Sequence, residues 1–324
     1  VFRMSTEIPD VDQQTYRTRL DFHSAGRKFS LSTVYQDTSP KGSQLATVIA
    51  VHGSPGSHRD FKHITPLLEA SGIRVIGVNY PGFGLTEDSE QLLHANEERT
   101  AFVEALIDRL GLTDRLLFLG HSRGGENALE LAVRNAEKCI GAVLLNPFGL
   151  RLNKAIRPRT TVDNIRYYHE SYPWMRPLIE WYLYQMYNRV IGLKVREGRH
   201  ALAAVKTMTT VALEKQEENL AAINRNADMR VLLCYSGKDH LIETEISEEF
   251  ADRFERMQRF VSLSKNCSTT KLKHKLQAFL SDASRRIAVA FPDDHHFSQA
   301  KRAKLIAQGI LAIVRSAERR QSSL

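Results

Sequence analysis

Short, largely apolar segments alternate with longer amphipathic segments through most of this chain, and this alternation constrains its fold more than any other feature. Ala46–Val51 and Arg74–Asn79 have the length and composition of strands that are buried on both faces. Helical patterns at Phe61–Ala70 and Glu90–Leu110 follow them, and each ends shortly before a glycine. This order of strand and helix predicts an α/β fold, with a mostly parallel central sheet that is flanked by helices on both faces.

The sheet is expected to extend in both directions from these strands. Near the start, Tyr16–Phe22 and Lys28–Tyr35 alternate polar and apolar residues, which predicts a half-exposed antiparallel hairpin. Later in the chain, Gly141–Leu145, Val231–Tyr235 and Ile287–Phe291 are again short apolar runs. Most of the chain therefore belongs to one sheet and its covering helices.

The alternation is interrupted in the middle of the chain. Residues 148–225 contain helical patterns and several prolines, but no buried strand. A helical block between two strands of a parallel sheet is expected to form an inserted cap over the carboxyl edge, where ligands of α/β proteins bind. We therefore assign 1–147 and 226–324 to an α/β body and 148–225 to a helical cap insertion.

A pentapeptide in the body has the pattern of a nucleophile elbow. Gly120-His121-Ser122-Arg123-Gly124 follows the strand expected at Leu116–Leu119 and precedes the helix expected at Asn127–Asn135. In such an elbow the serine occupies a very tight turn, and the glycines let strand and helix approach without a clash. The alternative interpretation is a small-residue turn without chemistry. The strand-turn-helix context favours Ser122 as a nucleophile.

A serine hydroxyl needs a base, and an acid that orients the base. In this arrangement the acid and the histidine follow the nucleophile in chain order. Asp239 ends the strand after the cap and is the candidate acid, although Asp is also common in turns that contain glycine. After the last strand come two adjacent histidines, of which His296 lies nearer the final helix than His295. We predict His296 as the base and leave His295 open.

An oxyanion that develops during acyl transfer needs two hydrogen-bond donors, usually backbone N–H groups. One donor is the N–H of Arg123, the residue after the nucleophile. The loop His52-Gly53-Ser54-Pro55-Gly56-Ser57 follows a buried strand, and its glycines allow an unusual backbone. We predict the N–H of Ser54 as the second donor, against the alternative of an ordinary strand-to-helix turn.

These motifs together resemble the α/β-hydrolase superfamily. The resemblance rests on His52–Ser57, the Asn79-Tyr80-Pro81-Gly82-Phe83-Gly84 turn, the Ser122 elbow, Gly237-Lys238-Asp239 and His296-Phe297. They look most similar to the branch with epoxide hydrolases and haloalkane dehalogenases, and to a poorly characterised nematode group. Such proteins place the catalytic base just before an aromatic or apolar residue, which favours His296.

The chain departs from that branch at the nucleophile. Epoxide hydrolases and dehalogenases use Asp, whereas this chain has Ser122, which suits carbonyl chemistry through an acyl-enzyme. The resemblance thus implies a serine hydrolase, similar to a carboxylesterase or lipase, acting on an ester, thioester or amide. The charged side chain of Arg123 either meets an acidic group of the substrate or pairs with a surface carboxylate, for example one from the cap.

Aromatic residues are concentrated in the expected cap. The segment 148–225 holds both tryptophans and six of the ten tyrosines of the chain. This suggests an apolar pocket for an acyl chain or an aromatic acid, with Tyr168, Trp174 and Trp181 as candidate substrate-binding residues. The alternative is that these rings pack the cap against the body. The expected partner is a small ester or a lipid-like molecule.

The net charge is +8, with a pI of about 9.4. The excess is partly local and suggests either weak contact with a membrane surface or a solvated helix face. No nucleic-acid-binding motif accompanies it, so nucleic acid is not an expected partner. These local basic residues are Lys265, Lys271, Lys273, Lys275, Arg285 and Arg286.

The cysteines, histidines and apolar segments of the chain indicate which cofactors and which cellular compartment to expect. No Cys/His cluster has metal-ligand spacing, and the mechanism requires neither a metal nor a cofactor. The three cysteines form no disulfide framework and suggest a reducing, cytoplasmic compartment. No segment has the roughly 18 apolar residues of a membrane helix. The chain starts with Val1, which leaves a removed targeting peptide open.

Two other functions remain open at this stage. The fold also hosts proteins that bind ligands without turning them over, although a binding protein has no need of Ser122, Asp239 and His296 together. A lyase or a cofactor-free oxidative enzyme would use the same fold with different chemistry. The oligomeric state does not follow from the sequence.

Overall fold

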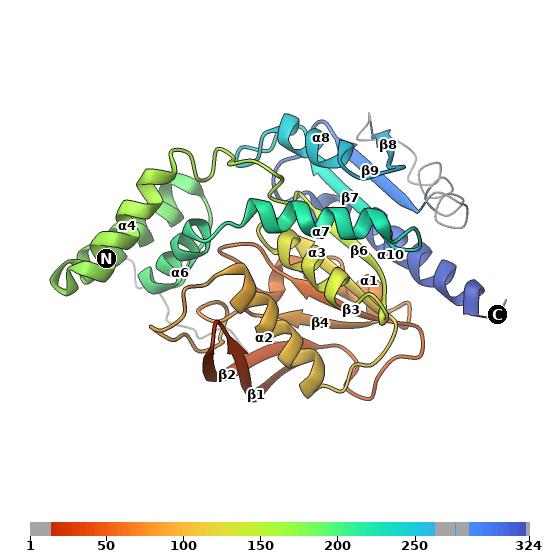
Figure 1. The fold of residues 1–324 in the computed structure, drawn as a ribbon, viewed down its shortest axis with the longest axis horizontal. Coiled ribbons are helices and arrows are strands. Elements are labelled where there is room, and N and C mark those ends of the chain that lie inside the picture. Colours follow the sequence, from red (N-terminus) through yellow and green to blue (C-terminus); the bar gives the residue numbers. More distant parts are fainter. Residues whose placement is uncertain (1–13, 263–275, 277–284, 322–324) are drawn as a thin grey trace, which may run out of the picture.

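The computed structural model describes residues 14–262, 276 and 285–321. Within these residues the chain forms one nine-stranded sheet with the order β1-β2-β4-β3-β5-β6-β7-β9-β8 (Figure 1). The strands are β1 (Thr15–Ser24), β2 (Arg27–Asp37), β3 (Thr47–Val51), β4 (Arg74–Val78), β5 (Leu116–His121), β6 (Cys139–Leu145), β7 (Arg230–Ser236), β8 (Gln258–Val261) and β9 (Arg286–Phe291).

Strand direction follows the sequence pattern. β1 and β2 form an antiparallel hairpin, and β2 joins the sheet antiparallel to β4. All other strand pairs are parallel. Every residue of β3, β4, β5 and β7 is buried, because helices cover both faces of the sheet. The predicted α/β fold with a mostly parallel sheet is confirmed.

Helices lie on both faces of the sheet. The structure has the short helices η1 (His58–Phe61), η2 (Pro173–Met175) and η3 (Met186–Ile191) and the α-helices α1 (Thr65–Glu69), α2 (Asn96–Arg109), α3 (Gly124–Arg134), α4 (Arg159–Ser171), α5 (Arg176–Gln185), α6 (Gly198–Thr209), α7 (Leu213–Arg225), α8 (Thr244–Asp252) and α10 (Ser298–Gln321). Apolar residues of α2, α3, α7 and α8 form one core cluster with the sheet, while those of α1 and α10 form a second.

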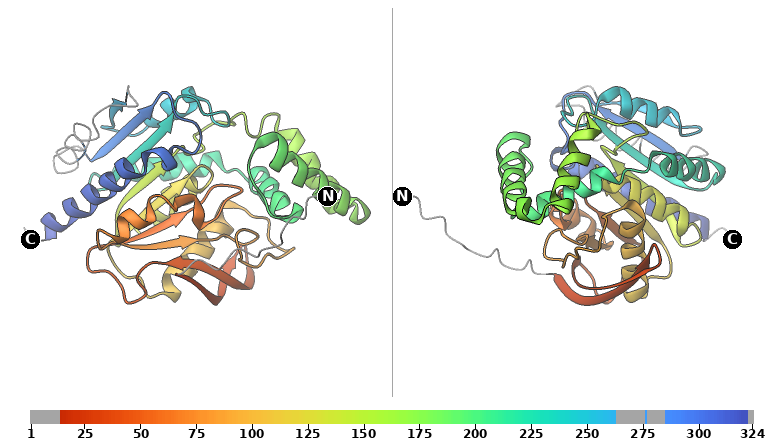
Figure 2. Two further views of the ribbon diagram at one scale, coloured as in Figure 1. Left: turned by 180° about the vertical axis from the view of Figure 1, so that it is seen from behind. Right: turned by 60° about the vertical axis from the view of Figure 1, so that its left-hand side comes forward.

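The segment between β6 and β7 is helical, as expected. Helices α4, α5 and α6 pack on one another and stand apart from the sheet at one end of the molecule (Figures 1 and 2). Helix α7 instead returns to the body and packs against α3, with Leu220 and Ile223 buried. The part of the predicted cap that stands apart from the sheet thus ends before α7, and an amphipathic pattern alone does not tell which partner a helix packs on. We call residues 148–212 the insertion.

Three further expectations differ from the structure in detail. In place of the helix expected at Phe61–Ala70 the structure has η1, which Ser57 caps and which ends at Phe61, and α1, which begins at Thr65 with Pro66 in its first turn. The helix expected from Glu90 begins at Asn96. The edge strand β8 was not anticipated, because its residues are mostly exposed and lack the apolar pattern of a buried strand.

Lys265, Lys271, Lys273 and Lys275 lie outside the described residues. In the part of the chain that the structure describes, no helix combines the length and hydropathy that a membrane-spanning segment requires.

Candidate active site

Ser122 lies in the tight turn between β5 and α3. Its backbone φ is +52°, in the left-handed region that residues with a side chain seldom occupy. The Ser122 N–H donates to the carbonyl of Leu145 at 2.9 Å, and the Gly125 N–H donates to the carbonyl of Ser122 at 2.9 Å. The strained turn is thus fixed by β6 on one side and by the first turn of α3 on the other.

The glycines of the elbow permit its close packing. A Cβ at Gly120 would lie 2.6 Å from the carbonyl oxygen of Gly124. A Cβ at Gly124 would overlap the carbonyl oxygens of Val51 and His52 at the end of β3. Any larger residue at either position would push the helix away from the sheet. The sequence prediction of a strand-turn-helix elbow agrees with this geometry.

The side chains of Asp239 and His296 are paired. His296 Nδ1 lies 2.7 Å from Asp239 Oδ2, and both side chains are 3% exposed. Asp239 follows β7 and His296 follows β9, and these strands are neighbours in the sheet. Because parallel strands end at the same edge, two residues that are 57 positions apart in sequence meet there.

Asp239 is held as a carboxylate. Its Oδ1 accepts from the N–H groups of Leu241 at 2.8 Å and Ile242 at 3.1 Å, and its Oδ2 accepts from Asn146 Nδ2 at 3.0 Å. Burial acts to raise the pKa of Asp239. The hydrogen bond and the electrostatic attraction of His296, together with the N–H groups of Leu241 and Ile242, outweigh burial and lower the pKa of Asp239 to about 2. Asp239 therefore accepts the Nδ1 proton of His296, which leaves Nε2 as the basic nitrogen.

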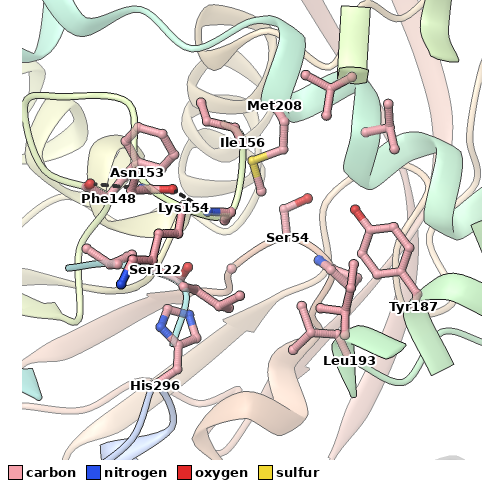
Figure 3. A pocket seen from close by; sticks show the side chains of 18 of the residues that line it. Ser54, Ser122, Phe148, Asn153, Lys154, Ile156, Tyr187, Leu193, Met208 and His296 are labelled. Carbon is pink, nitrogen blue, oxygen red and sulfur yellow. Dashed lines mark hydrogen bonds between the residues drawn. The ribbon is translucent and has the colours of Figure 1, made fainter. Parts of the chain in front are cut away.

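The environment of His296 favours the neutral imidazole. Burial lowers its pKa below 6.5, the hydrogen bond with Asp239 raises it in part, and the neighbouring His121 lowers it again. Its ring lies beside Ser122 in the same cavity (Figure 3). His295 is exposed, its Nδ1 is 2.9 Å from the carbonyl of Lys238, and it does not line this cavity. The structure thus brings together Ser122, Asp239 and His296, and not His295.

Two residues near this pair were missed by the sequence analysis. Asn146 follows β6, has a positive φ of +42°, and holds Asp239 through its side-chain amide. The sequence signal that could have identified Asn146 is its position at the carboxyl end of a buried strand. His121 lies with Nε2 at 3.1 Å from the carbonyl of His296, and its Nδ1 is 3.5 Å from Asp60 Oδ2. It therefore supports the backbone that carries the base.

The loop after β3 packs against the elbow. A Cβ at Gly53 would lie 3.0 Å from the Cβ of Ser122. His52 Nε2 accepts from the N–H of Tyr80 at 3.1 Å, so its Nδ1 carries the proton and donates to the carbonyl of Gly53 at 2.6 Å. Burial lowers the pKa of His52 to about 4, so this ring stays neutral and fixes the loop between β3 and β4.

The two predicted backbone donors lie beside the nucleophile. Arg123 follows Ser122 directly, and Ser54 follows the Gly53 that contacts it. Within the described residues, no hydrogen bond engages the N–H of Ser54 or that of Arg123. The Ser54 hydroxyl accepts from Thr207 Oγ1 at 2.8 Å, which ties this loop to α6 of the insertion.

The Arg123 side chain does neither of the two things expected of it. It is fully buried and forms an ion pair with Glu126 on its own helix. It also donates from Nη2 to the carbonyl oxygens of Thr207 at 3.1 Å and Thr210 at 3.4 Å, at the end of α6. The i, i+3 spacing of Arg123 and Glu126 in the sequence is what could have predicted this ion pair. The guanidinium therefore joins the body to the insertion and reaches neither substrate nor surface.

A largely apolar cavity of about 350 Å³ opens above Ser122 and His296 (Figure 3). The body supplies its polar end, and the insertion supplies most of its apolar wall. Apolar lining residues include Phe148, Ile156, Val162, Ile165, Leu193 and Met208. Among the described residues, no group of three or more His, Cys, Asp or Glu side chains is placed to hold a metal ion.

The predicted substrate-binding aromatics do not line this cavity. Tyr168, Trp174 and Trp181 are 45%, 76% and 60% exposed and lie on the outer side of the insertion. The expectation that they form the pocket wall is corrected: the wall is mainly aliphatic, and the aromatic residues that the insertion contributes are Phe148 and Tyr187. Composition alone located the rings in the insertion but did not tell which face of each helix they occupy.

The comparisons with known proteins agree with this geometry. A family model described as "Alpha/beta hydrolase of unknown function (DUF1057)" matches residues 9–315. An uncharacterized protein of Caenorhabditis elegans is 29% identical over 307 residues, which cover 92% of this chain and 85% of that protein. The nematode resemblance seen in the sequence is thereby confirmed.

Solved structures share the fold. A thermophilic esterase from Thermogutta terrifontis has a TM-score of 0.58 at 18% identity, with 93% of this chain and 98% of that chain covered. A haloalkane dehalogenase from Bradyrhizobium elkani has a TM-score of 0.63 at 14% identity, with 94% and 98% covered. At these identities the similarity establishes the fold and not the reaction.

Proposed function

This chain belongs to the DUF1057 family of α/β hydrolases, and from that premise we propose that it is a serine hydrolase, similar to a carboxylesterase or lipase. Its substrate is an ester, or a related thioester or amide, with an apolar acyl group. The observation that carries the proposal is the buried Asp239–His296 pair beside Ser122, at the floor of an apolar cavity.

The first half-reaction follows from the protonation of the pair. Nδ1–H of His296 donates to the ionised Asp239, so Nε2 takes the proton of the Ser122 hydroxyl as its oxygen attacks the substrate carbonyl. The N–H groups of Ser54 and Arg123 receive the developing oxyanion. His296 then gives the proton to the leaving alcohol, thiol or amine, and the acyl group remains on Ser122.

The second half-reaction restores the enzyme. A water molecule gives a proton to His296 Nε2 and attacks the acyl carbon, and the proton then returns to the Ser122 oxygen as the carboxylic acid leaves. The aliphatic wall above the serine suits an acyl chain, since it offers apolar contact over most of its area. Ser122 in place of an aspartate favours this acyl chemistry over the opening of epoxides or carbon–halogen bonds.

A fluorophosphonate probe tests the activated serine directly. We expect the parent protein to be labelled and Ser122→Ala not to be. Ser54 is the other serine that lines the cavity, and it contributes its backbone N–H, so Ser54→Ala is the matched control and should still be labelled. A folded parent protein that resists labelling would contradict the proposal and favour a ligand-binding protein.

Hydrolysis of p-nitrophenyl esters tests the reaction itself. We expect the rate to fall in Ser122→Ala by about four orders of magnitude or more. Among acyl chains of increasing length, kcat/KM should rise until the chain fills the cavity. Unchanged hydrolysis in Ser122→Ala would show that another group carries the reaction.

A further inference from the structure

The outward face of α5 and η2 is a stripe of exposed apolar side chains. Trp174, Leu178, Trp181 and Tyr182 are 76%, 59%, 60% and 53% exposed. Their spacing of four, seven and eight residues places them on one side of the helix. Leu183 of the same helix is 0% exposed and faces the insertion's own core. This helix therefore presents an apolar face on both sides, of which only one is covered by described residues.

Helix α4 continues the exposed stripe. Tyr167, Tyr168 and Tyr172 are 55%, 45% and 38% exposed. Their rings are in contact, with centroids 5.5 Å apart for Tyr167 and Tyr168, and Tyr172 is 6.5 Å from Trp174. These residues and the stripe of α5 form what we call the aromatic face: Tyr167, Tyr168, Tyr172, Trp174, Leu178, Trp181 and Tyr182.

The aromatic face needs an explanation because exposed apolar surface of this kind is uncommon. Soluble proteins expose single apolar residues freely, but seldom a run of large ones. The face also lies at the end of the molecule that is remote from the outer end of α10 (Figures 1 and 2). It is therefore placed to meet a surface without obstruction by the body.

The residue types of the aromatic face favour a lipid–water boundary as its partner. Apart from Leu178, every member is Trp or Tyr, whose ring is apolar and whose edge carries a hydrogen-bonding group. Such side chains collect at the level of lipid headgroups. An apolar surface that packs against another protein and excludes water would be expected to contain more Leu, Ile and Phe.

The charge of the insertion favours an anionic lipid surface. Residues 148–212 contain eleven Lys and Arg against four Asp and Glu, a net charge of +7, while the whole chain has +8. Several of these cations, including Arg189, Lys194 and Arg196, are exposed just after α5. Basic residues near a membrane are attracted by its negative surface potential. Most of the net positive charge of the chain therefore lies in the insertion that carries the aromatic face.

We propose that the aromatic face docks the protein onto an anionic phospholipid surface. The rings enter the headgroup layer, and the surrounding Arg and Lys side chains hold the lipid phosphates and carboxylates. Helix α4, which carries two tyrosines of the aromatic face, also lines the cavity through Val162 and Ile165, and Met186 lines it from η3 directly after α5. Resting on the proposed function, the substrate class is accordingly a lipid ester that reaches Ser122 from the docked surface.

The chain offers a direct measurement of docking. Its only two tryptophans, Trp174 and Trp181, both belong to the aromatic face, so intrinsic tryptophan fluorescence reports on this face alone. Phosphatidylcholine vesicles that contain about a fifth phosphatidylserine should shift the emission to shorter wavelength and protect it from acrylamide. Lipids brominated on the acyl chains should quench it. High salt should weaken the effect, since the attraction of surface charges is screened.

Vesicle flotation with variants tests which residues dock. Trp174→Ser/Trp181→Ser should weaken binding by about tenfold or more, because each ring would no longer leave water. Leu93→Ser, at a residue of the body that is 40% exposed, is the matched control and should bind like the parent protein. Arg189→Glu/Lys194→Glu should lose the preference for phosphatidylserine. Circular dichroism and the Tm establish that each variant is folded.

Three outcomes would overturn the docking proposal. Emission that does not change with anionic vesicles, or equal binding by the parent protein and Trp174→Ser/Trp181→Ser, would exclude lipid contact by this face. A shift without vesicles that grows with protein concentration, together with a doubled mass in sedimentation, would show that a second copy covers it. Ser122→Ala should dock unchanged, so docking without hydrolysis would refute only the proposed function, and hydrolysis without docking only this inference.

Discussion

The carboxyl edge of the sheet and the outer face of α5 both place side chains against the usual pattern of burial, and they do so in opposite ways. At the sheet edge, the polar side chains of Asp239 and His296 are buried. On α5, the apolar side chains of Trp174 and Trp181 are exposed. Proteins usually bury apolar groups and expose ionisable ones.

The two regions differ in whether the protein itself supplies partners for the buried polar groups and for the exposed apolar groups. The buried polar pair is satisfied from within, by the hydrogen bond between its members and by the donors of Asn146, Leu241 and Ile242. The rings of Trp174 and Trp181 remain 76% and 60% exposed among the described residues, and the partner that we propose for them is an external lipid surface. The polar groups at the sheet edge therefore have their partners within the protein, whereas the apolar groups of the aromatic face are left exposed to solvent.

The largest effect is expected at the sheet edge. His296→Ala removes the base, and we expect kcat for a p-nitrophenyl ester to fall by about three to four orders of magnitude. His295→Ala, the adjacent residue in the same loop, should change kcat less than about twofold, because it is exposed and outside the cavity. Equal losses in the two variants would mean that the loop, and not one imidazole, is required.

The next effect concerns the side chain that joins the two regions. Arg123→Met leaves the Glu126 carboxylate buried without its partner and removes donors to the end of α6. We expect the free energy of unfolding to fall by about 3–5 kcal/mol in a urea titration. Arg123→Met/Glu126→Gln should recover much of this loss, since no buried charge remains. A single variant as stable as the parent protein would show that the ion pair contributes little.

The sheet edge was largely predictable from sequence because its geometry follows from topology. Ser122, Asp239 and His296 each lie in the segment that follows a parallel strand of one sheet, so their order along the chain predicts their proximity. The backbone N–H of Ser54 could be predicted in the same way. Asn146 could not, because its role depends on a positive φ and a side-chain contact that no local pattern shows.

The insertion was predictable as helical, but not in its contacts. In α5 the apolar residues recur around the helix with no single polar face, so the sequence does not tell which side packs inward. Trp181 was expected at the substrate and lies outside, while Met208 lines the cavity without having been predicted. Arg123 shows the same limit, since its partners Thr207 and Thr210 come from a helix whose position depends on tertiary packing.

The pH dependence probes the buried pair. Because burial lowers the pKa of His296, the neutral base persists below pH 6.5, and kcat/KM should be constant near neutrality. As pH falls through that lowered pKa, activity should fall by about tenfold per pH unit. His240→Gln removes a neighbouring imidazole that lowers the pKa of His296, so the acid limb of this variant should lie at higher pH than that of the parent protein. An acid limb above pH 6.5 in the parent protein would contradict the buried environment.

The smallest effect on the fold is expected on the aromatic face, and it separates the two sides of one helix. Trp181→Ser should change the free energy of unfolding by less than about 0.5 kcal/mol, because the ring is 60% exposed. Leu183→Ala, two residues away but fully buried, should cost about 2–5 kcal/mol. Urea titrations of both variants measure this difference. If Trp181→Ser instead destabilised the protein as strongly as Leu183→Ala, the ring would serve the insertion's own packing, and its exposure would no longer require an external surface. If it leaves stability unchanged but weakens vesicle binding, the outer side of α5 has a role that the fold itself does not demand.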